Sequence, residues 1–189
     1  MDFIKNNPTI YILSGKASNG KNLAAKIISK IYNDKQTKSI NLAYASYLKD
    51  YAKNVLDWDG SESTKPRSFL QQLGVDLIKN KIDNKFLINR MLQDINIYSY
   101  FYKIITISDA RFIDEIETIK SKYDKVIVIH IYGIDSKSLT KEERKHISET
   151  ALDDYNKYDY EIDNSKSIEE LEESLFQIVK EVEHDSNSN

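Results

Sequence analysis

Residues 9–22, TIYILSGKASNGKN, constrain the fold of this chain more than any other stretch. They begin with an apolar, β-branched run that is typical of a buried strand. They continue through Gly15 and Gly20 to Lys21, after which apolar residues recur at spacings of three and four and predict a helix. A strand, a glycine-bounded loop, a lysine and a helix in this order are the layout of a phosphate-binding P-loop.

The chemistry of an anion cradle explains this layout. A helix N-terminus presents unpaired backbone N–H groups and a partial positive charge. Glycines let the backbone approach an anion closely, and Lys21 adds a full charge toward the outer phosphates of a nucleotide. The predicted phosphate-binding residues are therefore Gly15, Lys16, Ala17, Ser18, Asn19, Gly20, Lys21 and Asn22.

Asn22 departs from the usual form of this motif. The common pattern has a Ser or Thr after the lysine, and its hydroxyl holds Mg²⁺. The alternative interpretation of this stretch is a lysine-rich turn that opens an ordinary helix. The chain has only 5 glycines, and two of them bound this loop between a convincing strand and a convincing helix, which favours the P-loop. Asn22 then remains a candidate neighbour of the metal.

The composition excludes several classes of protein. A length of 189 residues predicts one domain, and a net charge of −3 argues against binding to polymeric nucleic acid. The absence of cysteine excludes a disulfide framework and a Cys-based metal site. No apolar run approaches the roughly 20 residues that span a membrane, and the N-terminus lacks a signal-peptide layout. We therefore expect a cytoplasmic protein without a membrane partner.

Apolar runs that read as strands alternate with helical patterns along the rest of the chain. This alternation predicts an α/β fold with a five-stranded parallel sheet and helices on both faces. The most apolar run, residues 126–131, is expected at the centre of the sheet, and residues 184–189 are predicted to be disordered. The other strands are predicted at residues 39–43, 103–108 and 158–162, and the helix after Pro66 is expected to bury Phe69, Leu70, Leu73, Leu77 and Ile78.

Asp109 and Arg111 directly follow the third predicted strand. Ligands of parallel sheets collect at the carboxyl ends of the strands. A carboxylate there can orient Mg²⁺ waters or bind the acceptor, and a neighbouring arginine can hold a phosphate bidentately. The alternative is a helix-capping Asp and a surface Arg. A P-loop on a neighbouring strand favours the functional interpretation.

Three further polar residues are weaker candidates. Arg67 and Gln71 share one helix face at a spacing of four and could grip the phosphate and base of a nucleotide. Spacing alone fits a solvated helix face better, and Lys49, a single lysine at a helix start, is an equally weak signal.

The chain resembles the deoxynucleoside monophosphate kinases of the bacteriophage and bacterial type, which have the P-loop kinase fold. Residues 15–21 look like that family's GKxxSGK loop. Residues 65–76 resemble its R-x-x-LQ-x-x-GTD helix, and residues 108–115 resemble its D-x-RF-x-x-E signature. Shorter similarities are to its FA-x-x-LK, W-x-N and H-x-SE segments, at residues 43–49, 86–90 and 146–149.

The chain also departs from this family. Asn22 and Leu23 replace its typical Asp-Thr pair, and Val75 and Leu87 replace its Thr and Trp, which leaves the acceptor base open. Animal-type phosphomevalonate kinases share a similar loop and D-x-R element, so they remain an alternative within the same chemistry. A nucleotide-binding regulatory protein that has lost catalysis is the alternative from another class.

The resemblance implies transfer of the ATP γ-phosphoryl group to a (deoxy)nucleoside monophosphate, by a monomer or a homodimer. It implies acceptor-binding helices at residues 44–98 and a charged lid at residues 134–149, with Mg²⁺ arriving on the nucleotide. By this resemblance, Lys21 would hold the donor phosphates and Asn164 would seat adenine. Arg111, Arg67 and Lys49 would bind the acceptor, and Gln71 would contact its base or sugar. Arg144 would be the lid cation, and Asp109 would serve Mg²⁺ or the acceptor.

Overall fold

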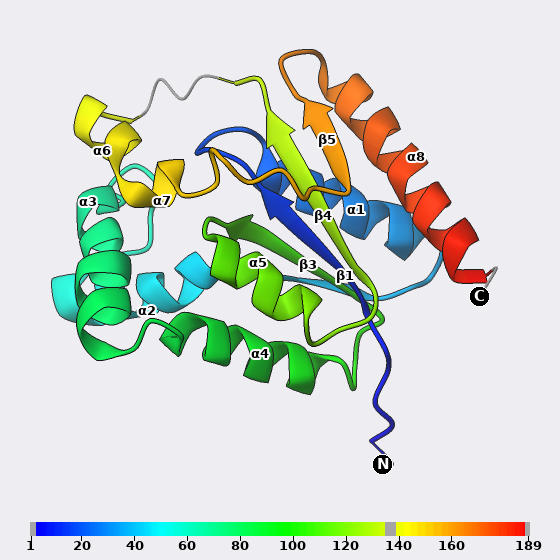
Figure 1. The fold of residues 1–189 in the computed structure, drawn as a ribbon, viewed down its shortest axis with the longest axis horizontal. Helices are drawn as coiled ribbons and strands as arrows, with labels where there is room; N and C mark the ends of the chain where they lie inside the picture. Colours follow the sequence, from blue (N-terminus) through cyan, green and yellow to red (C-terminus); the bar gives the residue numbers. More distant parts are fainter. Residues whose placement is uncertain (1–2, 135–138, 188–189) are drawn as a thin grey trace.

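The computed structural model describes residues 3–134 and 139–187 (Figure 1). One parallel sheet has the strand order β2-β3-β1-β4-β5, so the predicted α/β class and five-stranded parallel sheet are confirmed. Its strands are β1 (Thr9–Ser14), β2 (Ser39–Leu42), β3 (Ile104–Ala110), β4 (Val126–Tyr132) and β5 (Tyr160–Asp163).

The central strand is β1, which pairs with both β3 and β4. The expectation that residues 126–131 form the centre is wrong. An apolar run reports burial on both faces, and every inner strand of a parallel sheet shares that property. Hydrophobicity therefore separated inner strands from edge strands but could not rank the inner ones.

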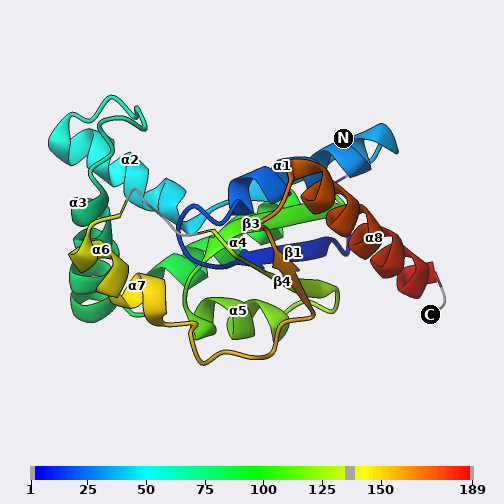
Figure 2. The ribbon, with the colours of Figure 1, turned by 90° about the horizontal axis from the view of Figure 1, so that it is seen from above.

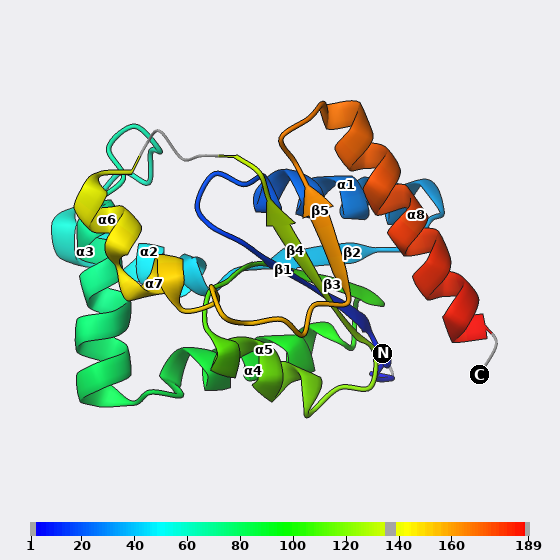
Figure 3. The same cartoon turned by 45° about the horizontal axis from the view of Figure 1, so that its top comes forward.

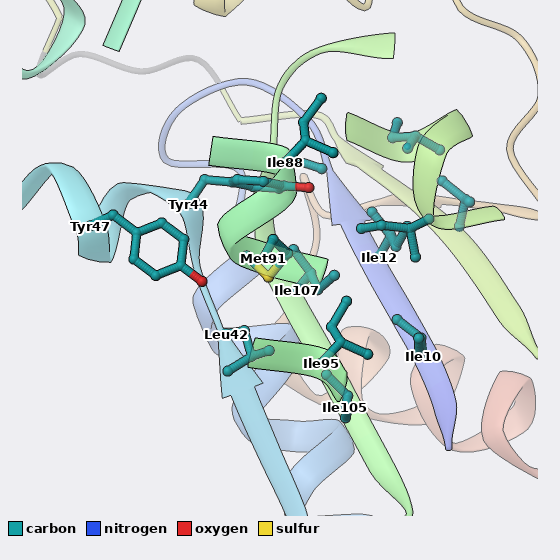
Figure 4. Packing of buried hydrophobic residues seen from close by; sticks show 14 of the residues in the cluster. Ile10, Ile12, Leu42, Tyr44, Tyr47, Ile88, Met91, Ile95, Ile105 and Ile107 are labelled. Atoms are coloured by element: carbon teal, nitrogen blue, oxygen red, sulfur yellow. The ribbon is translucent and has the colours of Figure 1, made fainter. Parts of the chain in front are cut away.

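Helices cover both faces of the sheet (Figure 2). α1 (Lys21–Asp34) and α8 (Ile168–Asn187) lie on one face, and α4 (Phe86–Tyr98) and α5 (Ile113–Lys120) lie on the other, which the start of α2 (Tyr44–Leu56) also joins. Alternate residues of β1 serve the two layers, as the strand period requires. Ile10 and Ile12 belong to one buried cluster with Met91 of α4 (Figure 4), whereas Tyr11 and Leu13 belong to the cluster formed with α1 and α8.

A π-helix, η1 (Gln72–Ile82), continues α3 (Arg67–Gln71). The N–H of Asp83 closes it with a 2.9 Å bond to the carbonyl of Ile78, five residues earlier. The wider turn moves the buried face of the helix. Gly74, Val75 and Ile78 are buried, whereas Leu77 is 44% exposed, so the prediction that Leu77 is buried is wrong. A period of 3.6 residues underlies that prediction, and the π turn does not keep it.

Two short helices, α6 (Lys141–Lys145) and α7 (Ile147–Thr150), form the described part of the predicted lid. They lie beside α3 at the carboxyl end of the sheet (Figure 3). Thr140 and Glu143 cap α6 reciprocally, at 2.8 and 3.2 Å. The amide of Gln71 donates to the carbonyl of Glu143 at 3.5 Å and links α3 to the lid. Residues 135–138, which the lid prediction includes, lie outside the described residues.

Helix α8 extends to Asn187, so the prediction of disorder from residue 184 is wrong for residues 184–187, while residues 188–189 lie outside the described part. Extending an existing helix costs far less than nucleating one. An ion pair of 2.5 Å between Glu183 and Lys35 ties this end of α8 to the end of α1. In the part of the chain that the structure describes, no helix is both long and apolar enough to cross a membrane.

Candidate active site

The loop between β1 and α1 needs both of its glycines. Gly15 has a φ of +133°, and a Cβ there would lie 2.1 Å from the carbonyl oxygen of Ile131. Gly20 has a φ of +91°, and a Cβ there would lie 2.4 Å from the amide nitrogen of Asn164. Other residues rarely adopt either conformation, and neither position has space for a side chain. The glycines therefore shape the P-loop (residues 15–21).

Lys21, the first residue of α1, folds back into the P-loop. Its ammonium donates to the carbonyl oxygens of Gly15 at 2.7 Å and Lys16 at 2.6 Å. Burial lowers the pKa of Lys21 to about 7, and the nearby charge of Arg111 acts in the same direction. The lysine is thus held by carbonyls of the loop, at a position from which it can turn toward an anion.

The anion-binding groups of the P-loop contact a carboxylate of the protein itself. Glu149 of α7 accepts a hydrogen bond from the backbone N–H of Ala17 at 2.9 Å and forms a short ion pair with Arg111. Arg111 also donates to the carbonyl of Ser148 at 3.1 Å. Glu149 was not among the site residues predicted from the sequence. Its one signal was the H-x-SE similarity at residues 146–149.

Asp109 caps a helix that lies far away in the sequence. Its two carboxylate oxygens accept the N–H groups of Tyr44 and Ala45, each at 2.8 Å, in the first turn of α2. A helix N-terminus attracts such a negative group. The predicted alternative was a cap of the following helix. Glu115 performs that function for α5.

Glu115 is buried at the start of α5. One of its oxygens accepts the N–H of Arg111 at 2.7 Å and the N–H of Phe112 at 3.1 Å. Burial raises the pKa of Glu115 to about 8, against the two N–H donors, which act in the opposite direction. Glu115 thereby fixes the backbone that carries Arg111.

The residues predicted to hold Mg²⁺ do not fit direct coordination. Asn22 is exposed on the first turn of α1, and both oxygens of Asp109 are engaged with backbone N–H groups. Among residues 3–134 and 139–187, no group of three or more His, Asp or Glu side chains could hold a metal ion. Asn22 and Asp109 therefore stay predicted neighbours of a Mg²⁺ ion that arrives with the nucleotide, rather than members of a preformed metal cluster.

A cavity of about 170 Å³, the inner cavity, lies between β3, α2, η1 and the P-loop. Arg67, Gln71, Asp109 and Arg111 all line it, together with Ala17 of the P-loop. The structure thus brings together four predicted residues from distant parts of the chain. Lys49 is not among the lining residues. The apolar part of the wall includes Leu48, Leu70, Val75, Ile78, Leu87, Ile88, Phe112 and Leu139.

Two lysines of the inner cavity, Lys65 and Lys79, were not predicted from the sequence. Lys65 lines it and shares the carboxylate of Glu62 with Arg67, at 2.9 and 3.2 Å. Burial is the largest of the effects that lower the pKa of Lys65. Lys79 also lines the cavity, with its ammonium 3.8 Å from the ring centroid of Phe112. No motif marked either lysine, since their role depends on how η1 and the loop before α3 fold back on β3.

A second, outer cavity of about 790 Å³ lies on the other side of the P-loop. It is lined by Lys16 and Asn19 of the P-loop, by the end of β4, and by Glu149 and Arg144 of the lid. Arg144 is exposed on α6, and its Nε donates to the carbonyl of Leu139 at 3.3 Å. The predicted lid cation therefore faces the outer cavity.

Asn164, which follows β5, holds the P-loop through a hydrogen bond to its backbone. Its amide donates to the carbonyl of Asn19 at 3.1 Å, and it is buried. The side chain of Asn19 in turn accepts the N–H of Ile134 at 3.2 Å, where the chain leaves β4 for the lid. Asn164 lines neither cavity, and its role in seating adenine stays a prediction.

Solved structures share this fold. An APS kinase from Mycobacterium tuberculosis matches with a TM-score of 0.53 and 10% identity, over 93% of this chain and 99% of that chain. A sugar kinase from Janibacter sp. matches with a TM-score of 0.56 and 12% identity, over 92% of this chain and 95% of that chain. At such low identity these likenesses establish the fold alone. The fold is that of P-loop kinases, as the sequence predicted.

None of the curated proteins matches the chain. The family model described as deoxynucleotide monophosphate kinase matches residues 6–175, a range that includes the P-loop, the inner cavity and the lid. This match covers most of the sequence and confirms the resemblance found in its motifs. The chain belongs to the deoxynucleotide monophosphate kinase family.

Proposed function

We propose that this protein transfers the γ-phosphoryl group of ATP to the phosphate of a (deoxy)nucleoside monophosphate. The inner cavity is the observation that carries this proposal. It places Arg67, Gln71, Asp109 and Arg111 beside Ala17 of the P-loop. A donor phosphate on the loop and an acceptor phosphate in the cavity would then be neighbours, as in-line transfer requires.

The residues around the P-loop would neutralise and orient the donor phosphates. The loop N–H groups and Lys21 would hold the β- and γ-phosphates, since Lys21 can exchange its carbonyl partners for phosphate oxygens. Arg111 shares one carboxylate with the Ala17 N–H, so its guanidinium would hold the acceptor phosphate directly beside a donor phosphate on the loop. Mg²⁺ bound to the nucleotide would supply further charge neutralisation.

The mouth of the inner cavity would receive the acceptor phosphate. Arg67 and Lys65 converge there on the exposed carboxylate of Glu62, a partner that a phosphate can replace. Lys49 acts on Glu62 and Lys65 through its charge and would add to this positive field. Gln71 would reach the base or sugar. Arg144 remains our proposed lid cation, acting after the lid moves inward from the outer cavity.

A panel of monophosphates tests this function. The protein is incubated with ATP, Mg²⁺ and each nucleoside or deoxynucleoside monophosphate in turn, and ADP formation is followed. We expect turnover with at least one of them. ATP binding without any turnover would instead indicate a regulatory nucleotide-binding protein, and turnover with phosphomevalonate alone would indicate the other kinase class.

Two lysines of α1 give a matched pair of variants. Lys21 is buried in the P-loop, whereas Lys26 is exposed on the same helix. Lys21→Ala should abolish turnover while the protein stays folded, because the donor phosphates lose their ammonium partner. Lys26→Ala should keep the wild-type rate. Full activity in Lys21→Ala would contradict the role assigned to the P-loop.

A further inference from the structure

We propose that Glu149 is an internal competitor of the nucleotide. Its carboxylate occupies the place of a phosphoryl group between the P-loop and Arg111, and nucleotide binding has to displace it. Glu149 would thereby set the affinity of the protein for nucleotides. The inference rests on one part of the proposed function, namely that the P-loop binds phosphate.

The partners of Glu149 are the groups that a phosphoryl group would use. One carboxylate oxygen accepts the backbone N–H of Ala17 in the glycine-bounded loop, at 2.9 Å. The other oxygen is paired with the guanidinium of Arg111. Loop N–H groups and arginine are the usual ligands of phosphate oxygens. The carboxylate therefore satisfies both sides of an anion site at once.

The burial of Glu149 shows that this contact is part of the folded site. Its side chain is 5% exposed, against 26% for Arg111. A buried carboxylate is stable only while it is paired, so leaving either partner unsatisfied would be costly. A phosphoryl group that enters the site supplies a new anion for Ala17 and Arg111, while Glu149 regains water when it moves out with α7.

The segment that carries Glu149 is suited to such a movement. It lies on α7, a helix of 4 residues, which His146 caps by accepting the N–H of Ser148 at 3.3 Å. A second link from the segment to the P-loop, between Asp153 and Lys16 at 3.0 Å, is largely exposed and therefore weak. Displacement of α7 thus breaks the two contacts of Glu149, the bond from Arg111 to the carbonyl of Ser148, and the exposed ion pair.

Competition of this kind lowers the apparent affinity for nucleotide. The site is available only in the fraction of molecules in which Glu149 has left it, and the apparent Kd rises in inverse proportion to that fraction. Removing the charge of Glu149 weakens the internal competitor and frees the site. The opposite result follows if Glu149 only orients Arg111 for the ligand, because the variant would then bind less tightly.

Calorimetry with inorganic tripolyphosphate, and separately with ATP, tests the proposal. In Glu149→Gln the amide oxygen can still accept a hydrogen bond, and only the charge is lost. We expect it to bind both ligands roughly tenfold more tightly than the wild type, on the order of 1.4 kcal/mol. The matched control is Glu142→Gln, which makes the same charge change at an exposed position on α6 and should keep the wild-type affinity.

A second variant covers the case in which Glu149→Gln folds poorly. Glu149→Asp keeps the charge but is one methylene shorter, so it cannot reach Ala17 and Arg111 together and should also bind tripolyphosphate more tightly. Unchanged or weaker binding in both Glu149 variants would overturn the proposal, as would an equal gain in Glu142→Gln. Tripolyphosphate needs no acceptor, so the result stands apart from whether any monophosphate is phosphorylated.

Discussion

Three cations of the candidate site are paired with groups of the chain itself. Lys21 contacts two carbonyls of the P-loop, Arg111 contacts Glu149, and Arg67 contacts Glu62. These internal partners keep the positive groups close together without a ligand. A ligand phosphate therefore replaces existing contacts, and its affinity depends on the charge state of each group.

Lys21 makes nucleotide binding depend on pH. Its pKa is lowered to about 7, so much of it is neutral at pH 8, whereas a bound triphosphate favours the charged form. Binding at pH 8 should therefore take up a proton, and the affinity should fall as pH rises above about 7. Calorimetry in buffers of different ionisation enthalpy measures this uptake. The proton uptake should vanish in Lys21→Met and persist in Glu115→Gln. Unchanged uptake in Lys21→Met would show that another group takes up the proton.

Gly15 should tolerate no side chain. In Gly15→Ala the Cβ would meet the carbonyl of Ile131 at 2.1 Å, so the P-loop must move and nucleotide binding should be lost. Gly60→Ala is the control, because Gly60 also has a positive φ, +85°, but its Cβ would lie 3.3 Å from the flexible end of Lys53. It should cost only about 1–2 kcal/mol of stability and leave binding intact. Retained ATP binding in Gly15→Ala would show that the loop adapts.

Among the elements, α2 is positioned by a strand that follows it by about 60 residues in the sequence. Asp109 at the end of β3 holds the first turn of α2, and the ring of Tyr44 packs into the core beneath it (Figure 4). The same helix supplies Leu48 to the wall of the inner cavity. The shape of that cavity thus depends on the bond between β3 and α2.

Asp109→Asn should loosen α2 without weakening the donor site. The amide keeps one acceptor for the two N–H groups of Tyr44 and Ala45, so we expect a loss of about 1–2 kcal/mol in stability. The KM for the monophosphate should rise, while the affinity for tripolyphosphate stays within about twofold. Steady-state kinetics and calorimetry separate the two effects. A large increase in the Mg²⁺ concentration needed for activity would instead support the metal role of Asp109.

At the scale of the whole molecule, Glu115 should make the free energy of unfolding depend on pH. Its folded pKa is about 8 against an ordinary value of 4.5, so between these values the folded state keeps a proton that the unfolded chain has lost. This contribution to the free energy of unfolding is complete below pH 4.5 and is lost as pH rises through about 8. Between pH 4.5 and about 8, the free energy of unfolding should fall by on the order of 1 kcal/mol per pH unit.

Urea unfolding at pH 5 and pH 8 measures this contribution. Glu115→Gln keeps an acceptor for the N–H groups of Arg111 and Phe112 but has no proton to lose, so its stability should depend less on pH than that of the wild type. The exposed Glu142→Gln should behave as the wild type does. Equal pH dependence in Glu115→Gln and the wild type would show that this carboxyl is ionised in the folded state at pH 5.

Local patterns predicted most of the fold and half of the site. Strand and helix periods depend on near neighbours in the sequence, so they predicted the sheet, the glycine-bounded loop and the position of Arg111 after β3. The burial of Leu77 was misjudged because η1 abandons the period on which the prediction relied. Glu149 was missed for a different reason. It contacts Ala17 across 132 residues, and no spacing rule reaches that far.

Both ends of the described chain lie near the amino ends of the strands, opposite the P-loop (Figure 1). The chain enters β1 from that side, and α8 returns to it alongside α1 (Figures 1 and 2). A fluorescent label or a surface linker attached to either terminus would therefore leave both cavities open. Immobilised protein should thus serve for kinetic binding studies in either orientation.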